Sequence, residues 1–197
     1  INPTFNLPPG SLGALPLPED DRPEVAEAQA AHAVALAQSK WDAVETSWRY
    51  SCSLEFGTTR FSNVVHLEIE HRAAIQGELA AVERQVNEHF AKAFGLEEDI
   101  LPAVSGWEQG DPRESPKSIV EELVSLAIGC MFGRYSLDGP GLILADQGAT
   151  LQDYLAKVSD PSFMPDADNV IPIVDGDWFE DDVVGKFRQF LRVAFGE

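Results

Sequence analysis

An apolar stripe in the middle of the chain constrains the fold most strongly. Six apolar residues recur there at intervals of three or four positions, namely Ile75, Leu79, Val82, Val86, Phe90 and Phe94. Residues three and four positions apart share one face of an α-helix, so this spacing predicts a helix with one apolar side. Gly95 follows directly, and glycine is common just past a helix end. The sequence therefore predicts a long helix from about residue 60 to residue 94.

A second helix is predicted before it, in an alanine-rich stretch. Asp21, Pro23 and Glu24 resemble a helix start, with an acidic cap and a glutamate three residues on. Residues with near-helical spacing then follow: Val25, Ala28, His32, Leu36, Trp41, Val44 and Trp48. A loop is expected at residues 51–59. Two long helices joined by a short loop predict an antiparallel hairpin.

The second half of the chain is predicted to add shorter elements. Ser115 and Pro116 form a cap and first position for a buried helix over residues 116–135, in which Gly129 and Gly133 permit close packing or end the helix early. Asp177 and Glu180 predict the start of a last helix. We also expect a short helix at 150–158 and short strands near 15–17, 142–145 and 170–174. At 170–174, Pro172 favours an edge strand or no strand. The expected fold is mainly α, a long antiparallel helical hairpin plus further packed helices, with a few short strands.

These elements divide the chain into three parts. Residues 1–22, rich in proline and glycine, are expected to form an extended arm. Residues 23–112 would hold the helical hairpin and a linker, and residues 113–197 a helical subdomain with short strands. The chain begins at Ile1 rather than at a methionine. We therefore expect it to be a piece cut from a longer protein.

The charge balance limits the functions open to this chain. Fourteen basic residues face 33 acidic ones, for a formal net charge of −19. A domain that binds DNA by itself usually carries the opposite sign, because cations on the protein neutralise phosphates. The simplest interpretation is a well-solvated acidic surface, and the alternatives are docking to a basic partner or mimicry of the charge of DNA. No apolar run is long enough to span a bilayer, and with only Cys52 and Cys130 we expect a cytoplasmic, reduced protein.

The first residues contain one short string with a catalytic precedent. Asn2-Pro3-Thr4-Phe5 partly matches the Asn/Asp-Pro-Pro-aromatic motif by which amino-methyltransferases hold a flipped base. Threonine replaces the second proline, and no glycine-rich cofactor loop precedes the string. An ordinary turn is the better interpretation. We assign no catalytic residue and no cofactor-binding residue to this chain.

Metal sites are not indicated either. His66 and His71 are five positions apart, which does not place both rings on one helix face. Asp175-Gly176-Asp177 departs from the calcium-loop pattern because Phe179 occupies the next ligand position. We interpret the histidines as satisfied or solvent-facing helix residues and the aspartates as helix caps and solvated loops.

Arg134 and Tyr135 are the candidate contact residues. They end an apolar helix, where the helix dipole and open carbonyls favour a cation, and the alternative is a contact with DNA or with another domain. Trp41 and Trp48 are interpreted as part of a core stripe rather than as a platform for stacking bases.

Several strings resemble, in order along the chain, the BREX phage-exclusion adenine-specific DNA methyltransferases of the PglX type. They are NPTFN (2–6), WD (41–42) with ETSW (45–48), CMFGRYSLD (130–138) with GLI (141–143), and DNVIPI (168–173) with FEDDVVG (179–185). The family's cofactor residues and base-flipping motif have no counterpart here. The resemblance therefore implies an internal segment that follows the catalytic domain and precedes the target-recognition domain.

Two functional hypotheses follow. In the first, the parent protein transfers a methyl group from S-adenosylmethionine to the N6 of adenine in a phage-defence or restriction-modification system. This segment would then be a non-catalytic spacer that supports specificity, with the other parent domains as its partners and DNA reached through the parent. In the second, the segment is an acidic protein-interaction module that docks a basic partner, such as another defence protein, or mimics DNA.

Overall fold

The computed structural model describes residues 10, 13–14, 23–57, 60–96, 115–176, 178–179 and 181–196. The described residues form five named helices and no strand: α2 (Pro23–Asp42), α3 (Phe61–Ala93), α4 (Pro116–Met131), α5 (Leu151–Lys157) and α6 (Val183–Phe195). Nearly all of the arm at 1–22, including the expected strand at 15–17 and the cap at Asp21, and the linker at 97–114 lie outside the described residues. The expectation of a mainly α fold is confirmed.

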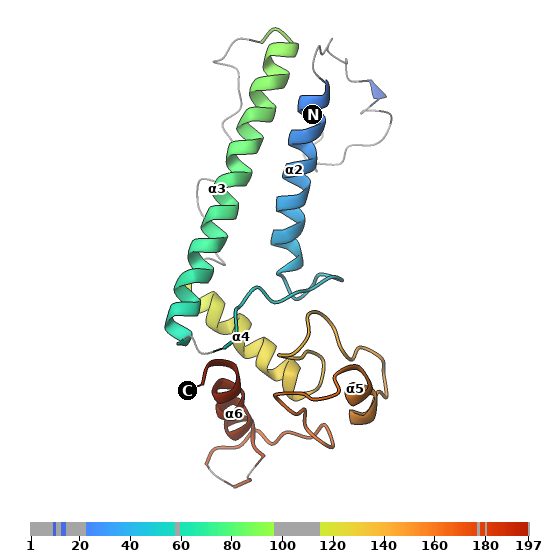
Figure 1. The fold of residues 1–197 in the computed structure, drawn as a ribbon, viewed down its shortest axis with the longest axis vertical. Helices are drawn as coiled ribbons and strands as arrows, with labels where there is room; N and C mark the ends of the chain where they lie inside the picture. The colour runs from blue at the N-terminus through green and yellow to red at the C-terminus, as the bar shows by residue number, and fades with distance from the viewer. Residues whose placement is uncertain are drawn as a thin grey trace.

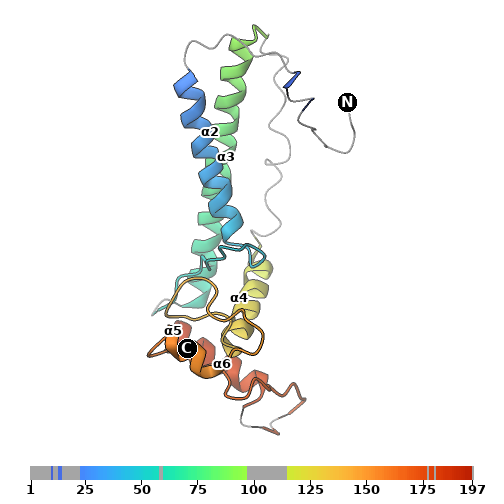
Figure 2. The same ribbon diagram turned by 90° about the vertical axis from the view of Figure 1, so that its right-hand side faces the viewer.

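Helices α2 and α3 lie side by side and antiparallel, as Figures 1 and 2 both show, and so form the predicted hairpin. Helix α3 buries Leu79 and Val82 of the predicted stripe, whereas α2 has no buried residue. Polar pairs join the two helices: Gln29 with Gln85 at 3.4 Å, His32 with Glu78 at 3.1 Å, and Lys40 with Gln76. The hairpin is therefore held by a narrow apolar seam and by side-chain hydrogen bonds.

Helix α2 ends six residues before the predicted apolar pattern does. The Ser47 hydroxyl donates to the Asp42 carboxylate at 2.6 Å, and the Ser51 N–H donates to the Asp42 carbonyl at 2.9 Å. These local bonds compete with helix continuation and turn the chain. Trp41 is 57% exposed and Trp48 is 100% exposed, so the interpretation of these tryptophans as a core stripe is wrong.

Helix α4 forms the centre of the core. Its cap is the one predicted: the Ser115 hydroxyl accepts from the Ser118 N–H at 3.1 Å, with Pro116 in the first turn. Helix α4 packs against the first half of α3 and against α6, below the hairpin in Figure 1. Its fully buried side chains include Ile119, Leu123, Cys130 and Met131. The helix ends at Met131 rather than at 135, because Gly133 adopts a φ of +69° that stops it.

The two predicted strands in the second half are wrong. Residues 142–145 and 170–174 are irregular, and one backbone bond ties each of them to the fold: Ile143 N–H to the Arg134 carbonyl at 2.8 Å, and Val183 N–H to the Pro172 carbonyl at 3.0 Å. A strand needs a neighbouring ladder of such bonds. The short helix is confirmed as α5, with a capping box formed by Thr150 and Asp153.

Helix α6 begins later than predicted. Asp182 is its cap, and the carboxylate accepts from the Gly185 N–H at 2.6 Å. A start capped by Asp177 is therefore wrong, and Asp177 and Glu180 themselves lie outside the described residues. The predicted apolar face of this helix does enter the core, where Phe190 and Ala194 are buried. None of the helices in the described ranges is long and apolar enough to cross a membrane.

A buried ion pair ties α6 to the loop before it. This pair makes the stability of the fold depend on pH in the acidic range. Lys186 Nζ lies 2.9 Å from Asp166 Oδ1, and the two side chains are 16% and 5% exposed. Burial of the Asp166 carboxylate raises its pKa, but the hydrogen bonds from Lys186 and Asp168 and the charge of Lys186 together outweigh burial and lower the pKa from 3.8 to about 2.

We therefore expect Asp166 to stabilise the fold fully above about pH 4 and to lose that contribution as the pH falls towards 2. The measurement is the free energy of urea unfolding between pH 2 and pH 6. In the Asp166→Asn variant, the fall in the free energy of unfolding from pH 6 to pH 2 should be smaller by about 2 kcal/mol. An unchanged pH profile in that variant would contradict the prediction.

Candidate functional site

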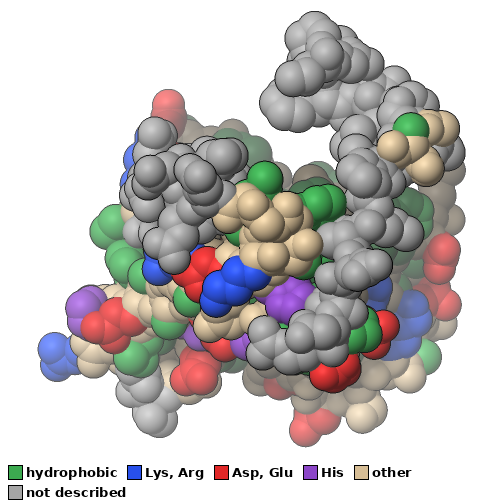
Figure 3. Space-filling model, turned by 90° about the horizontal axis from the view of Figure 1, so that it is seen from above, with side chains coloured by type: hydrophobic (Ala, Val, Ile, Leu, Met, Phe, Trp, Pro, Cys, Tyr) green, Lys and Arg blue, Asp and Glu red, His purple; other side chains and the backbone are tan. Residues whose placement is uncertain are grey.

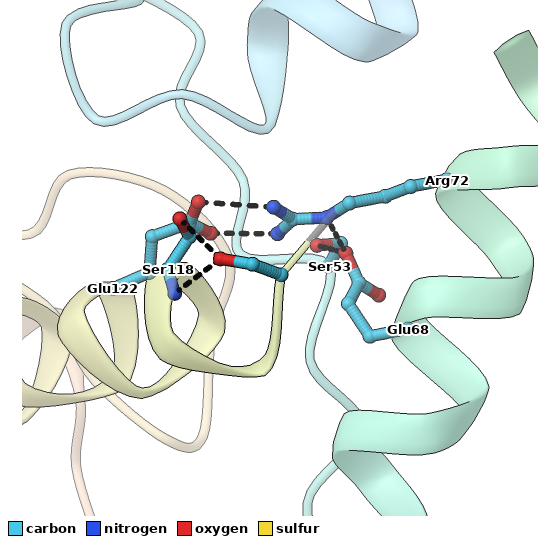
Figure 4. Close-up of polar contacts among 6 residues, drawn as sticks. Ser53, Glu68, Arg72, Ser118 and Glu122 are labelled. Carbon is cyan, nitrogen blue, oxygen red and sulfur yellow. Dashed lines mark hydrogen bonds and ion pairs between the residues drawn. The ribbon is translucent and has the colours of Figure 1, made fainter. Parts of the chain in front are cut away.

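Arg72 links three segments where the hairpin meets the core. From α3 its guanidinium donates to both carboxylate oxygens of Glu122 on α4, at 2.9 and 2.6 Å, and its Nε donates to Glu68 at 2.6 Å. Ser53, in the loop between α2 and α3, donates to the same Glu68 oxygen at 2.5 Å. Figure 4 shows the guanidinium of Arg72 lying between the two carboxylates. We call Ser53, Glu68, Arg72 and Glu122 the Arg72 clamp.

The Arg72 clamp is largely removed from water. Glu68 is 5% exposed and Arg72 16%, whereas Glu122 is 36% exposed. Burial of the guanidinium lowers the pKa of Arg72, but the hydrogen bonds to Glu122 and Glu68 outweigh burial and raise it above its ordinary value. A bidentate arginine–carboxylate pair also fixes the relative orientation of its two partners. The clamp therefore holds α3 at a defined angle to α4.

Glu45 forms a second link, on the α2 side of the hairpin. It lies in the turn that follows α2 and accepts a hydrogen bond from Ser125 of α4 at 2.5 Å. The Tyr135 hydroxyl donates to the other Glu45 oxygen at 2.8 Å and accepts from Arg134 Nε at 3.0 Å. We call Glu45, Ser125, Arg134 and Tyr135 the Glu45 link. Arg72 of α3 and Glu45 of the turn after α2 thus attach the hairpin to α4 at two separate points.

Tyr135 reaches Glu45 because Gly129 leaves room for its ring. A Cβ at position 129 would lie 2.3 Å from Tyr135 Cδ2, and the ring also packs against Tyr50 with centroids 5.0 Å apart. Burial of the phenol raises the pKa of Tyr135, and so does its hydrogen bond to Glu45, while the bond from Arg134 lowers it. The hydroxyl therefore stays protonated and acts as a structural donor.

The two candidate contact residues have different surroundings. Tyr135 is 2% exposed and lies within the core, whereas Arg134 is exposed. Arg134 borders a surface groove of about 470 Å³ together with Thr46, Trp48 and Leu142. A contact with DNA or with another domain stays a prediction for both residues, and in this structure Arg134 is the one whose side chain reaches the surface.

A cavity of about 270 Å³ lies between the hairpin and the core, beside the Arg72 clamp. Lys40, His71 and Cys52 contribute to its wall, and burial raises the pKa of the Cys52 thiol to about 11. A thiol with that pKa stays protonated at neutral pH and is a poor nucleophile. Within the described ranges there is no group of three or more potential metal ligands. His66 pairs with Glu70 at 3.3 Å, in line with the interpretation of the histidines as satisfied helix residues.

Sequence reasoning did not identify the Arg72 clamp or the Glu45 link. Glu68 and Arg72 are four positions apart on one helix, a spacing that favours an ion pair and could have been noticed. Glu122 is 50 positions from Arg72, and Glu45 is 90 from Tyr135. Only the folded arrangement of α3, α4 and the turn after α2 brings these residues together.

We expect Tyr135→Phe to destabilise the chain by about 1 kcal/mol, because one side-chain hydrogen bond is lost while the packing of the ring is kept. Urea unfolding of this variant, of Glu45→Gln and of the double variant forms a thermodynamic cycle. The two single effects should sum to more than the double effect by at least about 0.5 kcal/mol. Strict additivity would mean that the two side chains do not interact.

The chain resembles two curated proteins along its whole length, although no family model matches it. It is 26% identical, over an alignment of 216 residues, to the adenine-specific methyltransferase BrxX of Escherichia coli O9:H4 (strain HS). It is 27% identical, over 210 residues, to the adenine-specific methyltransferase PglX of Lacticaseibacillus casei (strain Zhang). The alignments cover 100% of this chain but only 18% and 16% of those proteins. The chain therefore matches a small part of each relative.

Proposed function

We propose that this chain, a distant homologue of the BREX adenine-specific methyltransferases BrxX and PglX over its full length, is a non-catalytic spacer within such an enzyme. Its task is geometric: it holds the part that carries S-adenosylmethionine and the part that reads the DNA site at a fixed separation. A flipped adenine must meet the methyl donor while another region grips the sequence around it. Small errors in placement are costly in such a reaction.

The observation that carries this proposal is the pair of polar links at the base of the hairpin. The Arg72 clamp and the Glu45 link attach α3 and the end of α2 to α4 independently. Two attachment points resist bending better than one, and a bidentate pair resists rotation as well. An elongated hairpin that stands on a compact base, as in Figure 2, is suited to keep two neighbouring domains apart.

The proposal that S-adenosylmethionine binds outside this segment can be tested in the full-length parent protein with the radiolabelled donor. Ultraviolet cross-linking followed by peptide mapping locates the donor site. We expect labelled peptides from outside this segment and none from residues 1–197. A labelled peptide from within the segment would overturn the proposal, and excess unlabelled S-adenosylmethionine, which should abolish specific labelling, is the control.

The acidic interaction module is the second candidate, and one loop favours it. Ile173 is 84% exposed, Trp178 77% and Phe179 54%, and exposed Asp175 and Asp181 lie among them. Large exposed aromatic side chains such as Trp178 and Phe179 are typical of protein-binding surfaces. In Figure 3, which views the open end of the hairpin, acidic and basic side chains are interspersed around the margin. Among the described side chains in that view there is no continuous acidic stripe of the kind that mimicry of DNA would need.

If this loop docks a basic partner, the affinity for that partner should depend on the negative charges of the loop. Asp175→Asn with Asp181→Asn in the full-length protein should weaken binding of a basic defence-system partner several-fold at low salt and less at high salt. Neutralising Glu27 and Glu88 on the hairpin is the matched control. Equal losses from both pairs would point to general charge rather than to this loop.

A further inference from the structure

Helix α4 carries an apolar ridge on its outer side. Val120, Val124, Ile128 and Phe132 are four positions apart and are 40%, 37%, 40% and 42% exposed. Residues at this spacing lie one above another on a helix, so the four side chains form one row. At about 1.5 Å per residue the row is about 18 Å long. The opposite face of α4 is buried in the core, and the helix is therefore apolar on both sides.

An ordinary surface helix shows a polar outer face. A continuous exposed apolar patch marks an interaction site. Lys117 and Glu121 flank the first turn of the ridge and pair with each other at 3.6 Å, so the charged residues stand at its edge. The ridge itself is therefore suited to contact another apolar surface.

Two grooves lie beside the ridge, on the side that faces the turn after α2. The first, of about 340 Å³, lies between α4 and the turn after α2 and is lined by Val44, Glu121 and Ser125 among others. The second continues past Trp48 to Arg134. Trp48 is fully exposed and stands on the rim of that second groove. An apolar ridge beside a groove with Trp48 on its rim is the kind of surface that binds an amphipathic helix.

We propose that this face of α4 binds an amphipathic helix supplied by the remainder of the parent polypeptide. The proposal rests on the proposed function, because it requires the chain to be part of a longer enzyme. The relatives contain more than four fifths of their length outside the matched segment, so ample chain exists to cover the ridge. The incoming helix should present apolar residues every three to four positions and a carboxylate close to Arg134, whose exposed guanidinium ends the groove.

Site-specific photo-cross-linking in the full-length protein tests this inference. Val124 and Ile128 are each replaced by p-benzoylphenylalanine (Val124→p-benzoylphenylalanine, Ile128→p-benzoylphenylalanine). The same replacement of Val34, which is 64% exposed on α2, is the exposed apolar control. Equal amounts of ¹⁴N- and ¹⁵N-labelled protein are mixed before irradiation, so that a bond within one molecule can be told from a bond between two. Adducts are then mapped by mass spectrometry.

We expect residues 124 and 128 to give at least about fivefold more adduct than residue 34, each joined to a peptide outside residues 1–197 with a helical apolar pattern and a single isotope label. Adducts with mixed isotope labels would assign the face to a second copy and overturn the proposal. Adducts to a peptide within residues 1–197, or yields no higher than at residue 34, would also overturn it. These outcomes are independent of where S-adenosylmethionine labels the protein, so either proposal can fail alone.

Discussion

Replacing Arg72 by methionine is expected to lower the free energy of unfolding by about 3 kcal/mol, which would be the largest effect of any single substitution in the two links. Methionine keeps much of the aliphatic volume, so the loss comes from electrostatics. Among the described residues, Ser53 alone would still donate a hydrogen bond to Glu68, which is 5% exposed, so a buried carboxylate would be left without its cation. Glu122 is 36% exposed and can turn to water at lower cost.

Two variants separate this effect from a general loss of charge. Lys117→Met removes a pair whose side chains are 85% and 65% exposed, and should change stability by no more than about 0.5 kcal/mol. Glu68→Gln combined with Arg72→Met removes the orphaned charge and should recover part of the loss. Urea unfolding measures all three. A loss below about 1 kcal/mol for Arg72→Met would show that the clamp contributes little to the fold.

Gly129→Ala is expected to destabilise the chain by about 2 kcal/mol, although alanine is the better helix former. The new Cβ would lie 2.3 Å from Tyr135 Cδ2 and 2.6 Å from Cε2. The ring cannot move aside freely, because Tyr50 packs against it and its hydroxyl is bonded to Glu45. The substitution should therefore loosen the Glu45 link as well as the core.

Gly77 on α3 provides the matched control. It is also a helical glycine, but nothing lies within 4 Å of a Cβ built there. Gly77→Ala should stabilise the chain by up to about 1 kcal/mol through helix propensity alone. The two glycine substitutions should thus change the midpoint of urea unfolding in opposite directions. A stabilising Gly129→Ala would show that Tyr135 is not held as the structure describes.

The helices could be predicted from the sequence because their signals are local. The stripe that includes Leu79 and Val82, the Ser115 cap with Pro116, and the box at Thr150 each lie within a few positions of the element they define. The strands were predicted wrongly for a related reason. A short apolar run such as Val170 to Val174 becomes a strand only when a neighbour pairs with it, and no such partner can be identified from one segment.

The candidate site was harder to predict, because its partners are distant in the sequence. Arg134 and Tyr135 were singled out together as a contact pair, but the structure buries Tyr135 and uses its hydroxyl to bond Glu45. Trp48 fits a helical pattern only if α2 continues, and the hydrogen bond between Ser47 and Asp42 in the turn after α2 exposes the ring instead. A local hydrogen bond thus ends the helical pattern before Trp48, whereas the contact that Tyr135 makes with Glu45 spans 90 positions of the sequence.

The most direct test of the spacer is adenine methylation by the full-length parent protein carrying Arg72→Met, assayed at a temperature where the protein remains folded. If the Arg72 clamp holds the donor-binding and DNA-reading parts in place, N6-methyladenine formation should fall at least tenfold while the affinity for S-adenosylmethionine changes less than about twofold. Lys117→Met should leave both unchanged. Undiminished methylation by the Arg72→Met protein would contradict the account, since the reaction would then proceed without the junction that is proposed to align it.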